Sequence, residues 1–77
     1  MTTVKVNVNS IDKVKGFVNT IVKFDNDFDL VAGRYVIDAK SIMGIFSLDL
    51  SQDLELHIGD GDPIEDIKAA LKDYIVE

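Results

Sequence analysis

The segment DAKSIMGIFSLDL, residues 38–50, places one serine directly before a short apolar run. Ser41 belongs to the residue types that cap helix N-termini, because its hydroxyl accepts a hydrogen bond from a free backbone N–H group. We expect a short helix over residues 42–48, which Gly44 and the turn formers at residues 51–53 limit to about two turns.

The apolar side chains of this run have two alternative roles. Either they only cover a core, or some of them form an apolar docking surface beside the serine. We expect Ile45 and Leu48 to point into the core. We expect Ile42, Met43 and Phe46 to stay partly exposed, as flexible and aromatic side chains do at adaptable docking surfaces.

Length and composition predict one domain over residues 1–77. The chain has no cysteine, so neither disulfides nor thiolate metal sites can stabilise it, which is typical of a reducing cytoplasm. Its beginning has no secretory signal pattern, and no apolar run is long enough to cross a bilayer. We therefore expect a cytoplasmic protein with no membrane partner. The formal charge of −6 also disfavours nucleic acid, because phosphate binding needs a basic face.

Periodicity on both sides of the quoted segment predicts the remaining elements. Alternating apolar residues indicate strands near residues 3–8, 28–32, 34–38 and 54–59. Gly33 is expected to supply the positive φ of the hairpin between the second and third strands. Apolar residues three and four positions apart indicate helices near residues 11–23 and 63–76.

Both longer helices begin with a capping pattern. Ser10 is expected to cap the first helix, and Asp62, followed by Pro63 and Glu65, is expected to cap the last. The order β-α-β-β-α-β-α is typical of an α+β open-faced sandwich, in which helices cover one face of a four-stranded antiparallel sheet. The residues expected in its core are Val14, Phe17, Val18, Ile21, Leu56, Ile58, Ile67 and Leu71.

The segment KSIMG, residues 40–44, followed by Ser47 and Leu48, resembles the HPr family, the small phosphocarriers of the sugar phosphotransferase system. The segment FVNTIVKFDNDFDL, residues 17–30, is similar to the family's first helix and second strand without a gap, and the similarity covers nearly the whole chain. The resemblance implies the HPr fold, in agreement with the element order. It also implies a regulatory serine, here Ser41, because in many Gram-positive bacteria a dedicated kinase phosphorylates the serine of this motif.

The same resemblance implies a partner surface and shows a departure in the chemistry. The positions of Ile42, Met43 and Phe46 match part of the apolar patch that HPr uses to bind enzyme I, enzyme IIA and the catabolite control regulator. The phosphoryl-accepting histidine of HPr falls here on Ser10, and its arginine falls on Asp12. The loop before them is about three residues shorter.

A serine hydroxyl without a neighbouring base is not a nucleophile at neutral pH, and Asp12 would repel the phosphate that an arginine binds. We therefore predict that ordinary phosphocarrier activity is lost and that the chain has no catalytic residue. His57, the only histidine, is expected to face solvent from the strand at residues 54–59, away from the first helix. The segment GDGD, residues 59–62, lacks the ligand spacing of a calcium loop and is expected to be a turn. No cofactor or metal is expected.

Three functions stay open from the sequence. The leading one is a non-catalytic HPr-like regulatory or adaptor module, switched by phosphorylation of Ser41 and similar to the catabolite-repression variant of HPr. The alternatives are a phosphotransferase-system phosphocarrier with an unrecognised acceptor and an HPr-fold scaffold without phosphorylation. The expected partners are proteins, such as an HPr kinase or a transcriptional regulator, and the chain is expected to be a monomer or weak homodimer.

Overall fold

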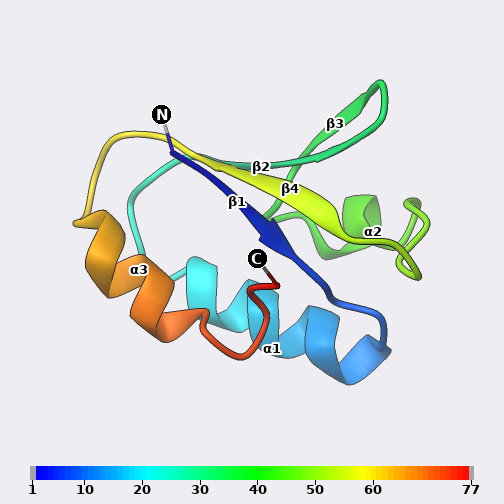
Figure 1. The fold of residues 1–77 in the computed structure, drawn as a ribbon, viewed down its shortest axis with the longest axis horizontal. Coiled ribbons are helices and arrows are strands. Elements are labelled where there is room, and N and C mark those ends of the chain that lie inside the picture. Colours follow the sequence, from blue (N-terminus) through cyan, green and yellow to red (C-terminus); the bar gives the residue numbers. More distant parts are fainter. Residues whose placement is uncertain (1, 77) are drawn as a thin grey trace.

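The computed structural model of the protein describes residues 2–76 (Figure 1). Its elements follow the predicted order β-α-β-β-α-β-α. They are β1 (Thr2–Val6), α1 (Ile11–Ile21), β2 (Phe28–Ala32), β3 (Tyr35–Asp38), α2 (Ile42–Ile45), β4 (Leu54–Ile58) and α3 (Ile64–Ala70).

The four strands form one sheet in the order β1-β4-β2-β3, and each neighbouring pair is antiparallel. Figure 1 shows α1 and α3 beneath the same face of this sheet. The short helix α2 lies at one end of the sheet, where it contacts α1 and β3. This arrangement confirms the predicted α+β open-faced sandwich.

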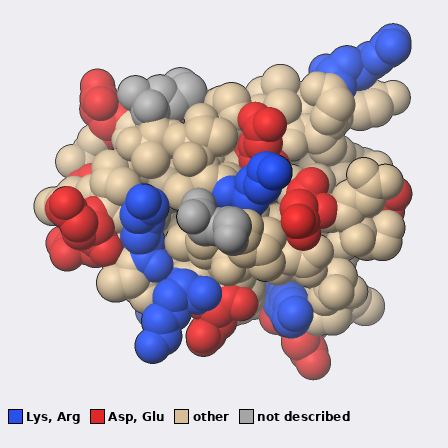
Figure 2. Space-filling model, in the orientation of Figure 1, with Lys and Arg blue, Asp and Glu red and all other residues tan. Residues whose placement is uncertain are grey.

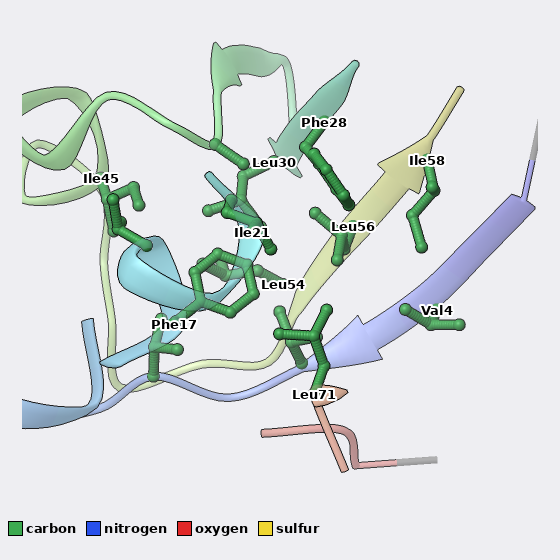
Figure 3. Packing of buried hydrophobic residues seen from close by; sticks show 14 of the residues in the cluster. Val4, Phe17, Ile21, Phe28, Leu30, Ile45, Leu54, Leu56, Ile58 and Leu71 are labelled. Carbon is green, nitrogen blue, oxygen red and sulfur yellow. The ribbon is translucent and has the colours of Figure 1, made fainter. Parts of the chain in front are cut away.

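The core lies between the sheet and the helices, and all eight residues expected there are buried. Figure 3 shows Phe17 and Ile21 of α1 facing the side chains of the sheet. The ring of Phe17 also meets the ring of Tyr74 edge to face, with centroids 5.8 Å apart. Ile45 is completely buried, so α2 is attached to the same core.

The hairpin between β2 and β3 turns at Gly33, whose φ of +61° confirms the expected positive angle. In this hairpin Ala32 pairs with Tyr35 and Asp29 pairs with Asp38. β3 is the outermost strand of the sheet and has no second strand partner among residues 2–76. The hairpin therefore leaves a free backbone edge.

The predicted helix over residues 63–76 is too long. α3 ends at Ala70, because the chain then turns back along β1 instead of continuing as a helix. The Asn7 N–H donates to the Tyr74 carbonyl at 2.8 Å, and the Val76 N–H donates to the Lys5 carbonyl at 2.9 Å. These long-range bonds hold residues 74 and 76 against β1, and the N–H groups of Tyr74 and Ile75 donate to the Leu71 carbonyl where the chain turns.

The predicted cap of α3 is also wrong. The residue before this helix is Pro63, which has no side-chain hydrogen bond to the first turn. The Asp62 carboxylate instead accepts from the Asp25 N–H at 3.0 Å, on a distant loop. The Asp62 side chain, which the local sequence pattern predicts to cap α3, makes a long-range hydrogen bond instead.

The other elements differ from expectation only at their ends. β1 stops at Val6, although Val8 beyond it is fully buried. The expected helix over residues 42–48 is helical only over Ile42–Ile45. The N–H groups of Ser47 and Leu48 donate to carbonyls three residues back, at Gly44 and Ile45, so the chain leaves the helix through a tighter turn.

Candidate phosphorylation and docking site

Ser10, on which the resemblance places the family histidine, caps α1 as expected. Its Oγ accepts a hydrogen bond from the Lys13 N–H at 3.1 Å, and its backbone is extended, with φ −147° and ψ 159°. Asp12 follows in the first turn of the helix. Ser10 is exposed, and its hydroxyl oxygen is occupied by the cap rather than by a basic side chain.

Ser41 caps α2 in the same way. Its Oγ accepts from the Gly44 N–H at 3.3 Å, and its carbonyl accepts from the Ile45 N–H at 3.1 Å. The side chain is exposed, and its backbone has φ −94° and ψ 101°. The expected cap is therefore present, on a hydroxyl that solvent can reach.

The neighbours of Ser41 in the KSIMG segment have structural roles that the sequence analysis did not identify. Lys40 Nζ donates to the Phe24 carbonyl at 2.9 Å and lies 5.5 Å from the centre of the Phe28 ring. These contacts fix the chain just before Ser41 to the segment between α1 and β2. The sequence shows only a lysine before an apolar segment. It gives no sign of these contacts, because Phe24 and Phe28 are far from Lys40 in the chain.

Gly44 leaves room for the Ser41 side chain. A Cβ atom at Gly44 would lie 3.2 Å from Ser41 Oγ and 3.5 Å from Ile37 Cδ1. Any larger residue at this position would therefore press on the hydroxyl itself. Glycine lowers the intrinsic helix propensity at this position, but its lack of a side chain leaves the Ser41 hydroxyl unobstructed.

We call Ile42, Met43 and Phe46 the α2 surface. Met43 is 76% exposed, Phe46 is 39% exposed and Ile42 is half-buried, whereas Ile45 is fully buried. These exposures confirm the expected division of the apolar run. Leu48 is only half-buried and packs against the core from its margin.

The α2 surface lies at the end of the molecule where α1 begins. Figure 1 shows α2 above the N-terminal half of α1, and the two helices are in contact. Ile11, in the first turn of α1, is 62% exposed although it fits the apolar periodicity of that helix. The structure thus brings the Ser10 and Ser41 helix starts to one end of the fold, with exposed apolar side chains in both first turns.

His57 is partly exposed on β4 and pairs with Glu55, with 3.0 Å between Nε2 and Oε1. On β4 it alternates with the buried residues Leu56 and Ile58, so its side chain lies on the sheet face opposite α1 and α3. The structure does not bring it to Ser10 or Ser41. The GDGD segment is a loop, as expected, and residues 2–76 contain no group of three or more side chains suited to a metal ion.

Charges of both signs are interspersed on the face of the molecule that Figure 2 shows. In the view of Figure 2, lysine and arginine side chains lie between aspartate and glutamate side chains instead of gathering in one basic patch. One carboxyl group has a perturbed pKa: hydrogen bonds from the Ser51 hydroxyl and the Ser51 N–H lower the pKa of Asp49 from its ordinary value. Among residues 2–76, no helix is long and apolar enough to span a membrane.

Comparison with known proteins decides the family. The family model described as the PTS HPr component phosphorylation site matches residues 4–77. The chain belongs to the HPr family. HPr proteins are phosphocarriers that interact with other proteins of the phosphotransferase system.

Two solved HPr structures show the same fold. HPr-C-His from Thermoanaerobacter tengcongensis is 31% identical, over 95% of this chain and 89% of that chain, with a TM-score of 0.77. The histidine-containing phosphocarrier protein of Mycoplasma is 15% identical, over 94% of this chain and 91% of that chain, with a TM-score of 0.70, and supports the fold alone. No curated protein gives a significant match.

Proposed function

We propose that this HPr-family chain is a non-catalytic regulatory or adaptor module that binds protein partners through the α2 surface. Phosphorylation of Ser41 switches this binding, and Ser10 occupies the position of the lost phospho-histidine. The partners are an HPr kinase and a further protein such as a transcriptional regulator, and the protein acts in the cytoplasm. The observation that carries the proposal is the exposed Ser41 hydroxyl next to the exposed side chains of Met43 and Phe46.

The arrangement at Ser10 supports the absence of ordinary phosphocarrier chemistry. Phosphoryl transfer to a hydroxyl needs a base that removes its proton, and Ser10 Oγ contacts the Lys13 N–H instead. Asp12, in the first turn of the same helix, brings a negative charge toward any incoming phosphate. A phosphoryl donor that approaches α1 therefore meets neither a nucleophile nor a cationic clamp at these two positions.

The arrangement at Ser41 supports a switch that changes binding more than stability. A phosphoserine carries a charge of about −1.5 to −2 and favours the start of a helix by about 0.3–1 kcal/mol. That small gain falls on a helix of one turn, whose attachment to the core through Ile45 does not change. The same charge lies beside the α2 surface, where it would attract a basic partner or repel an acidic one.

The test is treatment with an HPr kinase and ATP, followed by intact mass and peptide mapping. We expect one phosphoryl group on Ser41, no product from Ser41→Ala, and normal product from Ser47→Ala. Ser47 is the matched control, because it is an exposed serine just beyond α2 whose hydroxyl bonds a carbonyl of that helix. The melting temperature should change little on phosphorylation, whereas capture of partners from the native lysate should change strongly. Absence of phosphate on Ser41, or unchanged capture, contradicts the switch.

One observation favours a second candidate, a phosphocarrier with an unusual acceptor. His57 contacts the Glu55 carboxylate, and a carboxylate is the kind of group that orients a reactive imidazole. The candidate is weaker, because His57 lies on the opposite face of the sheet from α1. An acid-labile phosphoryl group on His57 would favour it over the regulatory module.

A further inference from the structure

A cleft separates the β2–β3 hairpin from the loop between α2 and β4. Its volume is about 620 Å³, which lies in the range of ligand-binding clefts. The hairpin side is lined by Ala32, Gly33, Tyr35 and Ile37, and the loop side by residues 47–49 and 52–54. We call this space the hairpin cleft; it shares no residue with the α2 surface.

The walls of the hairpin cleft combine apolar and acidic side chains. Tyr35 is 65% exposed, and Ile37 and Leu48 are half-buried, so apolar surface is open to an incoming group. Asp49, Asp53 and Glu55 also line the cleft, against one cation, Lys5, which stands opposite Glu55 in the β1–β4 pair. Three carboxylates against one ammonium give a lining with a net charge of −2.

Two of these carboxylates are held in place by hydrogen bonds. Asp49 accepts from the Ser51 hydroxyl at 2.6 Å and from the Ser51 N–H at 3.1 Å, and these bonds lower its pKa. Asp53 accepts from the Asn7 side chain at 3.0 Å. Because these hydrogen bonds already restrict both side chains, little further side-chain freedom is lost when a cation binds. The entropic cost of binding is therefore lower.

The shape and charge of the cleft select its occupant. An anion is repelled by the lining, and a second copy of this chain, with a formal charge of −6, is repelled as a whole. A basic segment with apolar neighbours matches both kinds of wall. β3 also has a free outer edge in the described chain, so an extended backbone can add hydrogen bonds there.

We propose that the hairpin cleft binds an extended basic and apolar peptide segment of a partner protein. An arginine or lysine side chain lies between Asp49 and Asp53, and an apolar side chain of the peptide packs on Tyr35, Ile37 and Leu48. This binding does not depend on phosphorylation of Ser41, so the proposed switch can fail while this inference holds.

The test is an NMR titration of the full chain with the peptide acetyl-Val-Arg-Phe-Arg-Val-amide. We expect saturable shifts of the amide signals of residues 31–37 and 47–55, and no saturable shifts with the same peptide carrying glutamate in place of arginine. Asp53→Asn should weaken binding about twofold to fivefold, as expected for one exposed charge pair. Tyr35→Ser should weaken it about threefold to tenfold, because the aromatic contact is lost.

Asp60→Asn is the matched control, because it removes the same charge from an exposed position outside the cleft and should leave the affinity unchanged. The proposal is overturned if no saturable shift appears, if the glutamate peptide binds equally well, or if Asp60→Asn weakens binding as much as Asp53→Asn. Shifts confined to the α2 surface also overturn it. So do shifts of the cleft signals caused by protein concentration alone, since these would assign the cleft to a second copy.

Discussion

At the scale of single residues, the structure shows why a poor helix former stands in the middle of α1. The sequence predicts that Gly16 weakens this helix by about 1 kcal/mol relative to alanine. In the fold, a Cβ atom on Gly16 would clash with the Tyr74 hydroxyl, whose ring packs on Phe17. Gly16 lowers the helix propensity of α1, but it leaves the space in which the Tyr74 side chain packs against this helix.

We expect Gly16→Ala to destabilise the protein. Although alanine favours the helix, we expect the free energy of unfolding to fall by about 1 kcal/mol, because the methyl group displaces Tyr74. Urea denaturation measures this change. In a Tyr74→Phe background, which lacks the hydroxyl, Gly16→Ala should cost much less. An increase in stability of the single variant would show that Tyr74 moves aside freely.

The sequence predicted the side chains that act within their own turn and missed those that act at a distance. Ser10 and Ser41 cap helices as expected, because the partner N–H groups lie three residues along the chain. Asp62 was assigned to a cap by the same logic, but it bonds to Asp25 instead. No local pattern shows such a partner, since the two residues are 37 positions apart in the chain.

At the scale of elements, Asn26 joins two loops at the same end of the sheet. It is the only fully buried polar residue identified among residues 2–76. Its Nδ2 donates to the Gly59 and Asp62 carbonyls at 2.9 and 3.2 Å, and its Oδ1 accepts from the Asp62 N–H at 2.8 Å. The GDGD loop before α3 is therefore shaped by a residue before β2, which is why its form could not be predicted from its own sequence.

We expect Asn26→Asp to lower the free energy of unfolding by about 3 kcal/mol at neutral pH, although the two side chains have the same shape. The new carboxylate cannot donate, and it would face two carbonyl oxygens in a buried position. Asp27→Asn is the control at the next, exposed position, where the effect should stay within about 0.5 kcal/mol. Equal effects in urea denaturation would contradict the assigned role of Asn26.

At the scale of the whole molecule, the periodicity of the sequence was sufficient for the fold class and the core. The buried side chains of α1 and α3 were predicted, as were Leu56 and Ile58 of β4, since each has to face the single layer of core between sheet and helices. Leu54 of β4 is also buried but was not among the residues expected in the core. The ends of the elements were not predicted, because they depend on contacts between distant parts of the chain. The segment after α3, for example, leaves the helix and pairs with the end of β1, where Ile75 bridges to Val6. The partial exposure of Ile42, Met43 and Phe46 was predicted correctly. The hairpin cleft was not predicted, because it lies between the hairpin and a loop that are far apart in the sequence.

The core and the surface of α1 should respond differently to truncation. Phe17→Ala should cost about 3–5 kcal/mol, because the ring is fully buried between α1, the sheet and Tyr74. Ile11→Ala, in the exposed first turn of the same helix, should change stability by less than about 0.5 kcal/mol. Thermal and urea unfolding of both variants measure the difference. A small effect at Phe17 would mean that α1 does not anchor the core.

We propose that this member of the HPr family does not carry phosphate by the family's ordinary route. The most direct test is incubation with enzyme I and phosphoenolpyruvate, followed by intact mass measurement at neutral pH, beside a histidine-containing HPr as the positive control. We expect the control to gain a phosphoryl group and this chain to keep its mass, because Ser10 Oγ contacts a backbone N–H and no base, and Asp12 repels phosphate. A phosphoryl group on Ser10, or an acid-labile one on His57, would contradict it.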